Sequence, residues 1–188
     1  MCTRHTVRGK RAAILRRGGA TAPAPRYGGA VTRVLIAGVG NLLRGDDGFG
    51  PAVVERLGAL PAGVQAIETG IGGMALLQEL MSGWDGLVVV DAVDRGAAPG
   101  RVFVLEPAVG AAVHVPDVHL ANPDRVLSMA KALGVLPARV RIVGCQPAEV
   151  DALGEGLSPA VERALPHAVA QVHAIVREWL GDDGHAVA

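Results

Sequence analysis

Five short segments rich in aliphatic residues divide the chain, and most are bounded by glycine, proline or charged residues. The two most apolar segments, at 34–38 and 86–91, are typical of strands that are buried in a sheet. We therefore expect five strands, at residues 34–38, 64–68, 86–91, 101–105 and 139–143. The run at 86–91 is the most apolar of the five, because four consecutive aliphatic residues precede Asp91.

Helix signals lie between most of these strands. Asn122 and Pro123 are a favourable N-cap and first helical residue, and Gly134 is a typical stop. Ser158 and Pro159 begin the last helix in the same way. We expect four helices, at residues 50–60, 74–82, 122–133 and 158–180.

Alternating strands and helices predict a three-layer α/β/α fold, with a mostly parallel five-stranded sheet covered on both faces. One connection departs from this pattern. Residues 92–100 join the third and fourth strands with only nine residues. A parallel crossover needs about a dozen or more. We therefore expect the fourth strand to run antiparallel to the third, at one edge of the sheet.

The charge of the chain is unevenly distributed. Residues 1–33 contain eight Arg and Lys and no acidic residue, whereas the other 155 residues contain ten basic and eighteen acidic ones. We interpret 1–30 as a disordered basic extension, 31–182 as a single domain and 183–188 as a flexible tail. An acidic body, in a chain with only five aromatic residues, argues against a nucleic-acid surface.

Two cysteines do not make a disulfide framework, and no apolar stretch reaches the ~18 residues that a membrane span needs. We therefore expect a cytoplasmic protein, with a monomer as the default state and no membrane partner.

Candidate chemistry begins in the loop after the first strand. Gly40 and Asn41 are followed by the adjacent carboxylates Asp46 and Asp47. A dinucleotide-binding fingerprint would need glycine where Leu43 stands, so NAD or FAD binding has little support. The two aspartates can be read as helix caps, or as one cap, for which Asp46 is the better choice, and one residue that faces a ligand.

A second carboxylate, Asp91, ends the most apolar strand, where α/β sheets bind ligands. It can also be a structural aspartate bonded to loop amides, and Asp94 can be its partner or a turn former. His114 and His119 both lie in the loop before the third helix. Two carboxylates and one imidazole suit nickel, zinc or iron better than magnesium. We interpret Cys145 as a small buried side chain rather than a nucleophile.

These residues stand in motifs that resemble those of the [NiFe]-hydrogenase maturation endopeptidases. The run Gly-Val-Gly-Asn-Leu-Leu-Arg-Gly-Asp-Asp-Gly-Phe-Gly at 38–50 resembles the first motif of that family. Later motifs follow in order at residues 69–74, 90–94, 99–102, 119–120, 143–147 and 156–158. The resemblance covers about residues 33–180. It departs at Asp47, where the family often has Glu, and at Leu120, where it often has Gln.

The resemblance implies an endopeptidase, often classed as aspartic-type. Such enzymes remove the C-terminal peptide of a hydrogenase large-subunit precursor after nickel insertion. It implies that Asp47, Asp91 and His119 are the catalytic and metal-contacting residues. The nickel is expected to arrive with the precursor and to be absent from the free protein. The residues expected to approach the substrate backbone are Gly40, Asn41, Gly70, Gly72 and Gly73.

Other functions compete with this one. A non-catalytic chaperone or binding module could use the same three residues to sense nickel, and it would bind the precursor without shortening it. A nucleotide-binding oxidoreductase would show cofactor absorbance. An inactive paralogue would neither shorten the precursor nor show cofactor absorbance.

Overall fold

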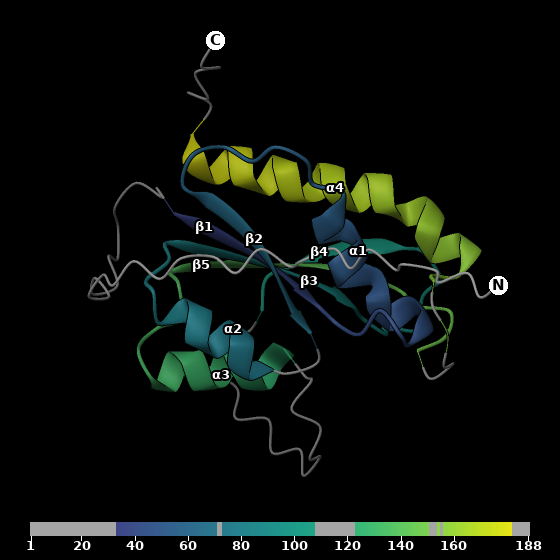
Figure 1. The fold of residues 1–188 in the computed structure, drawn as a ribbon, viewed down its shortest axis with the longest axis horizontal. Coiled ribbons are helices and arrows are strands. Elements are labelled where there is room, and N and C mark those ends of the chain that lie inside the picture. Colours follow the sequence, from purple (N-terminus) through teal and green to yellow (C-terminus); the bar gives the residue numbers. More distant parts are fainter. Residues whose placement is uncertain (1–32, 71–72, 108–122, 151–153, 155, 182–188) are drawn as a thin grey trace, which may run out of the picture.

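The computed structural model describes residues 33–70, 73–107, 123–150, 154 and 156–181. Within them the chain forms strands and helices in an alternating order (Figure 1). The strands are β1 (Val34–Val39), β2 (Val64–Gly70), β3 (Gly86–Ala92), β4 (Val102–Leu105) and β5 (Arg139–Cys145). The helices are a short 3-10 turn η1 (Gly45–Gly48), α1 (Phe49–Glu55), α2 (Gly73–Leu80), α3 (Pro123–Ala132) and α4 (Pro159–Leu180).

The strands form one five-stranded sheet in the order β2-β1-β3-β5-β4. The first three pairs in this order are parallel, and β4 pairs antiparallel with β5 at the edge. This confirms the predicted fold class and the direction of the fourth strand. That strand is not adjacent to β3, however, because β5 lies between them.

Two hydrophobic cores lie on the two faces of the sheet. Helices α1 and α4 cover one face, and α2 and α3 cover the other (Figure 1). Side chains alternate along each strand, so Val88 and Val90 of β3 join the first core, whereas Leu87 and Val89 join the second. Double burial explains why β1 and β3 read as unbroken apolar runs.

Helix α1 is shorter than predicted. It ends at Glu55 rather than near residue 60. Gly58 adopts a left-handed φ of 68°, which a continuing helix does not allow. Only seven residues of helix therefore connect the loop after β1 to the turn before β2.

The carboxyl ends of β1 and β3 form the point where the strand order reverses, because the chain goes from β1 to β2 on one side and returns to β3 on the other. In open α/β sheets ligands bind at this position. The loop from β1 to α1 and Asp91 of β3 both lie there. In the described part of the chain, no helix is long and apolar enough to span a membrane.

Candidate functional site

Two glycines bring the start of α1 into direct contact with the strand ends. A Cβ atom on Gly38 would lie 2.6 Å from the carbonyl oxygen of Gly50. A Cβ atom on Gly50 would lie 2.3 Å from the carbonyl oxygen of Val39 and 2.4 Å from that of Val90. Real Cβ atoms do not approach so closely, so both positions need glycine. The loop between them is therefore held close to the ends of β1 and β3.

Asp47 is fixed inside this loop. Gly40, at φ 127°, passes so close that a Cβ atom there would lie 1.8 Å from the carbonyl oxygen of Asp47. The backbone N–H of Asn41 donates to Asp47 Oδ2 at 2.9 Å. Burial raises the pKa of the half-buried Asp47 carboxyl, and this outweighs the lowering by the Asn41 N–H and the charge of Arg44.

Asp91 is the second carboxylate of the site. It is the penultimate residue of β3 and is only 7% exposed. Burial raises its pKa well above the usual range, and the nearby charge of Asp47 raises it further. The backbone N–H of Ala92 opposes these two effects. The structure therefore brings Asp47 and Asp91 close enough for their charges to repel one another.

The two carboxylates provide oxygen donors that fit a divalent cation. A cation between them would offset both their repulsion and the cost of their burial. Among the described residues no group of three or more His, Cys, Asp or Glu could hold a metal ion. His119, the third predicted ligand, lies outside the described residues, as does Gly72. The three-residue site therefore stays a prediction.

A cavity of about 300 Å³ lies at Gly40 and Asn41, the two residues that contact Asp47, although Asp47 itself does not line it. It is lined by Gly40, Asn41, Leu42, Pro51, Glu68 and Gly70. Three of the five residues predicted to approach the substrate are in this lining: Gly40, Asn41 and Gly70. Gly73 is the first residue of α2, just beyond it. A Cβ atom on Gly70 would meet nothing within 4 Å, so the backbone there is open to a ligand.

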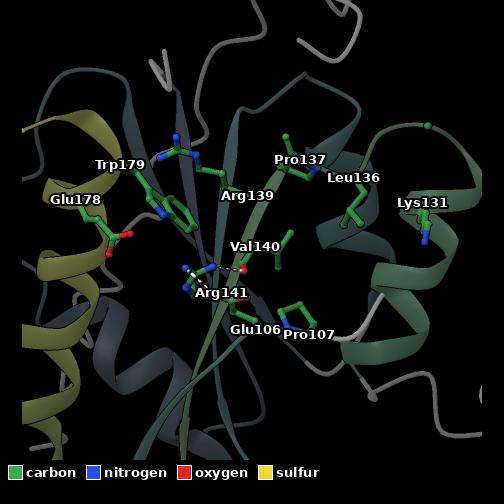
Figure 2. A pocket seen from close by; sticks show the side chains of 12 residues that line it. Glu106, Pro107, Lys131, Leu136, Pro137, Arg139, Val140, Arg141, Glu178 and Trp179 are labelled. Atoms are coloured by element: carbon green, nitrogen blue, oxygen red, sulfur yellow. Dashed lines mark hydrogen bonds and ion pairs between the residues drawn. The ribbon is translucent and has the colours of Figure 1, made fainter. Parts of the chain in front are cut away.

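A larger cavity, of about 600 Å³, lies at the amino-terminal end of β5, at the edge of the sheet opposite Asp47 and Asp91 (Figure 2). Trp179 and Glu178 of α4 form one side, Lys131 of α3 the other, and Arg139 begins β5 between them. None of the residues that line this cavity belongs to the carboxyl edge of the parallel strands. Its size alone therefore does not make it the catalytic site.

The comparisons with known proteins agree with this geometry. A family model described as hydrogenase maturation protease (HycI) matches residues 51–175. The chain belongs to the hydrogenase maturation protease family. It is 36% identical over 154 residues to the hydrogenase expression/formation protein HupD of Rhodobacter capsulatus, a match that covers 78% of this chain and 72% of that protein. It is 34% identical to the hydrogenase 2 maturation protease of Escherichia coli, over 78% of this chain and 92% of that one.

A solved structure supports the same assignment. The hydrogenase maturating endopeptidase HybD from E. coli superposes with a TM-score of 0.68 at 33% identity, over 78% of this chain and 93% of the other. The chain is therefore a hydrolase of the peptidase class. This confirms the family resemblance and the predicted enzyme class.

In this maturation protease Asp46 does not cap α1, contrary to the prediction. It is only 1% exposed, and its carboxylate accepts four hydrogen bonds from the loop between β5 and α4. Oδ2 accepts from the backbone N–H of Ala148 at 2.7 Å and of Glu149 at 3.2 Å, and from the hydroxyl of Ser158 at 2.9 Å. Oδ1 accepts from the backbone N–H of Ser158 at 2.7 Å. Asp46 therefore ties the two loops together.

Gln146 is a supporting residue of the protease that the sequence analysis missed. It is buried directly after β5, and its Oε1 accepts from the N–H groups of Arg95 and Ala97. Its Nε2 donates to Asp94 Oδ1 at 2.9 Å, which lowers the pKa of Asp94. Asp94 also accepts from the Gly96 N–H, so it is a turn former and not a partner of Asp91. The sequence did contain a signal for this residue, because a polar side chain directly after a buried strand needs hydrogen-bond partners.

Cys145 is a small buried side chain, as predicted from the sequence. The side chain is buried in the core beneath α4, and burial raises the pKa of its thiol to about 11. A thiol in this state supplies almost no thiolate at neutral pH. It is therefore not the nucleophile.

Proposed function

We propose that this protease removes a C-terminal peptide from the large-subunit precursor of a [NiFe] hydrogenase after nickel has entered that precursor. The observation that supports the proposal is the pair of carboxylates formed by the half-buried Asp47 and the buried Asp91. They stand at the strand-order reversal of a hydrogenase maturation protease. Relatives with the same fold carry names of hydrogenase maturation enzymes.

In this proposal Asp47, Asp91 and His119 contact the nickel of the precursor. Nickel is part of the substrate, and in that place it can polarise a scissile carbonyl or activate a water molecule. Asp91 offers an oxygen donor at a fixed strand end. Asp47 offers a second, oriented by the N–H of Asn41. The two carboxylates and an imidazole suit nickel.

The burial of the carboxylates gives a physical reason for selecting the loaded precursor. Desolvation and mutual repulsion make the ionised pair costly in the free protein, as the raised pKa values of Asp47 and Asp91 indicate. A precursor that carries a divalent cation offsets this cost, whereas an empty precursor does not. Nickel in the substrate therefore acts as the signal that the precursor is ready for cleavage.

The cavity beside Asp47 suits an extended peptide. Gly40, Asn41 and Gly70 line it, and the Gly70 backbone is not shielded by a side chain. We propose that the C-terminal segment of the precursor passes over these residues, with Gly72 and Gly73 along its course. The proposal also places the reaction in the cytoplasm, with the protease acting as a monomer, in keeping with a composition that has two cysteines.

The proposal is tested by the intact mass of a nickel-loaded large-subunit precursor before and after incubation with the protease. We expect loss of one short C-terminal peptide, and no loss from the nickel-free precursor. His119→Ala should abolish cleavage and leave the melting temperature nearly unchanged. His167→Ala is the matched control, because His167 is exposed on α4, and it should cleave at the wild-type rate.

Two outcomes would contradict the proposal. Cleavage of the nickel-free precursor at the same rate would remove nickel from the recognition step. Stable binding of the loaded precursor with unchanged mass would instead identify a binding module that senses nickel.

A further inference from the structure

Exposed apolar side chains gather around the catalytic edge of the protease. Among the described residues, eight large apolar side chains are more than a third exposed: Leu42, Leu43, Met74, Met81, Val104, Met129, Leu133 and Val150. Four of these follow the carboxyl ends of β1, β2 and β5, the edge that carries Asp47 and Asp91. We call these four, Leu42, Leu43, Met74 and Val150, the apolar rim.

Backbone contacts and a shared cavity connect the segments that carry the apolar rim. The carbonyl oxygen of Leu43 accepts from the N–H of Gly154 at 3.2 Å, so the loop before Asp47 pairs with the loop after β5 that contains Val150. Leu42 and Gly70 line the same cavity, and α2 begins three residues after Gly70. The rim therefore lies on three segments at one edge of the sheet, and one of its residues, Leu42, lines the cavity.

The backbone that displays the two leucines is fixed. The N–H of Leu43 donates to Asn41 Oδ1 at 3.0 Å, and the N–H of Arg44 donates to the carbonyl oxygen of Asn41 at 3.0 Å. These bonds close a tight turn, yet the Leu43 side chain at its tip remains 58% exposed. An exposed apolar side chain on a fixed backbone contributes little to the fold, but it is well prepared for an interface because the backbone needs no ordering on binding.

We propose that the apolar rim is the surface on which the folded body of the hydrogenase large-subunit precursor docks, through a complementary apolar patch beside its C-terminal segment. The inference rests on the proposed function. A substrate protein that delivers a peptide bond to Asp47 must cover the loop on which Leu42 and Leu43 stand, since they lie only four and five residues away. The rim thus adds affinity for the protein, separately from the groups that contact nickel.

A second copy of this chain is the competing occupant. It would cover the carboxylates and exclude the substrate, so it fits an active protease less well than the precursor does. The two occupants differ in a measurable way, because a rim that joins two copies produces a dimer in the absence of precursor.

The experiment compares two double variants with the full-length protease and nickel-loaded precursor. Leu43→Gln/Met74→Gln changes two side chains of the rim, which are 58% and 62% exposed. Leu133→Gln/Met129→Gln is the matched control beyond the rim, with one leucine and one methionine that are 59% and 44% exposed. Glutamine keeps helix propensity and most of the side-chain volume. Cleavage kinetics give KM and kcat, and light scattering of the free protein gives its mass.

We expect the rim variant to raise KM about 10-fold or more, with kcat within about 2-fold of wild type, because interface anchors contribute to binding and not to the chemical step. The control variant should keep both constants. If both variants cleave with wild-type KM, the rim is not the docking surface, although the proposed function stands. A wild-type dimer that the rim variant converts to a monomer would assign the rim to a second copy. A wild-type protein that neither binds nor cleaves the precursor would refute the proposed function itself.

Discussion

Asp46 provides a quantitative test of how the loop that carries Asp47 is held. Its buried carboxylate accepts three hydrogen bonds at Oδ2 and one at Oδ1, all from the loop between β5 and α4. Asp46→Ala leaves three backbone N–H groups and one hydroxyl without their acceptor. A hydrogen bond to a charged group contributes roughly 1.5–3 kcal/mol, and water that enters the space recovers part of the loss. We expect the variant to lose about 3–5 kcal/mol of unfolding free energy.

Two milder variants should form a graded series with Asp46→Ala. Asp46→Asn keeps the size of the side chain, but its amide has one acceptor oxygen. With that oxygen at the Oδ2 position it keeps three bonds, and its NH₂ group then faces the N–H of Ser158. We expect a loss of about 1–3 kcal/mol. Ser158→Ala removes only the hydroxyl bond and should cost about 1 kcal/mol.

The assay is urea unfolding of the three variants, with the rate of precursor cleavage measured beside it. Asp46→Asn should slow cleavage as well, because Asp47 follows directly in the chain and shares the displaced loop. The reasoning is refuted if Asp46→Ala unfolds within about 0.5 kcal/mol of wild type. It is refuted as well if Ser158→Ala destabilises more than Asp46→Ala, since the hydroxyl makes only one of the four bonds.

Three further predictions follow from other contacts. Asp91→Asn should abolish cleavage and yet raise the melting temperature by a few degrees at pH 7–8. The pKa of Asp91 is higher in the folded state than its unfolded value of 3.8, so the stability of the wild type falls as the pH rises above 3.8, and asparagine avoids this loss. The gain should disappear near pH 4, and a variant that melts lower than wild type at pH 8 would contradict the assigned burial cost. Gly40→Ala places a Cβ atom 1.8 Å from a backbone oxygen and should cost about 3 kcal/mol or more in urea unfolding, whereas Gly58→Ala meets nothing within 4 Å and should cost only about 1 kcal/mol. Equal losses of unfolding free energy in the two variants would show that the close approach of Gly40 to the Asp47 carbonyl oxygen is not important. Gln146→Ala should speed hydrogen exchange of the loop amides between β3 and β4 about 10-fold or more, and unchanged exchange would mean that other contacts hold this loop.

The local pattern of the chain predicted most of the fold. Each strand was expected within a few residues. Burial on both faces makes β1 and β3 apolar runs that are visible in the local sequence, whereas β5 carries Arg139 and Arg141 in its exposed or half-buried first part. The short connection of residues 92–100 also predicted the direction of β4. Its neighbour could not be predicted, since β5 arrives 34 residues after β4 ends and inserts between β3 and β4.

The candidate site was predicted only in part. Asp91 was recognised because a carboxylate after four buried aliphatic residues needs a special environment. The roles of Asp46 and Asp47 could not be told apart in the same way, because adjacent residues have the same local sequence around them. The bonding partners of Asp46 are Ala148, Glu149 and Ser158, which lie 102 to 112 residues later in the chain, and no local pattern reports contacts at that distance. Gln146 was missed for the same reason, as its partners lie about 50 residues earlier.

The sequence by itself determined the alternation of strands and helices, the family resemblance and the acidic residues from which a site could be built. These depend on side-chain type and on spacing along the chain. Only the tertiary structure decided which of two neighbouring aspartates faces the site and which ties two loops together. It also showed that Asp47 raises the pKa of Asp91, and that Gly40 is needed for a close approach within the loop. Burial, repulsion and close contact are properties of neighbours in space, and these neighbours are brought together only when the sheet forms.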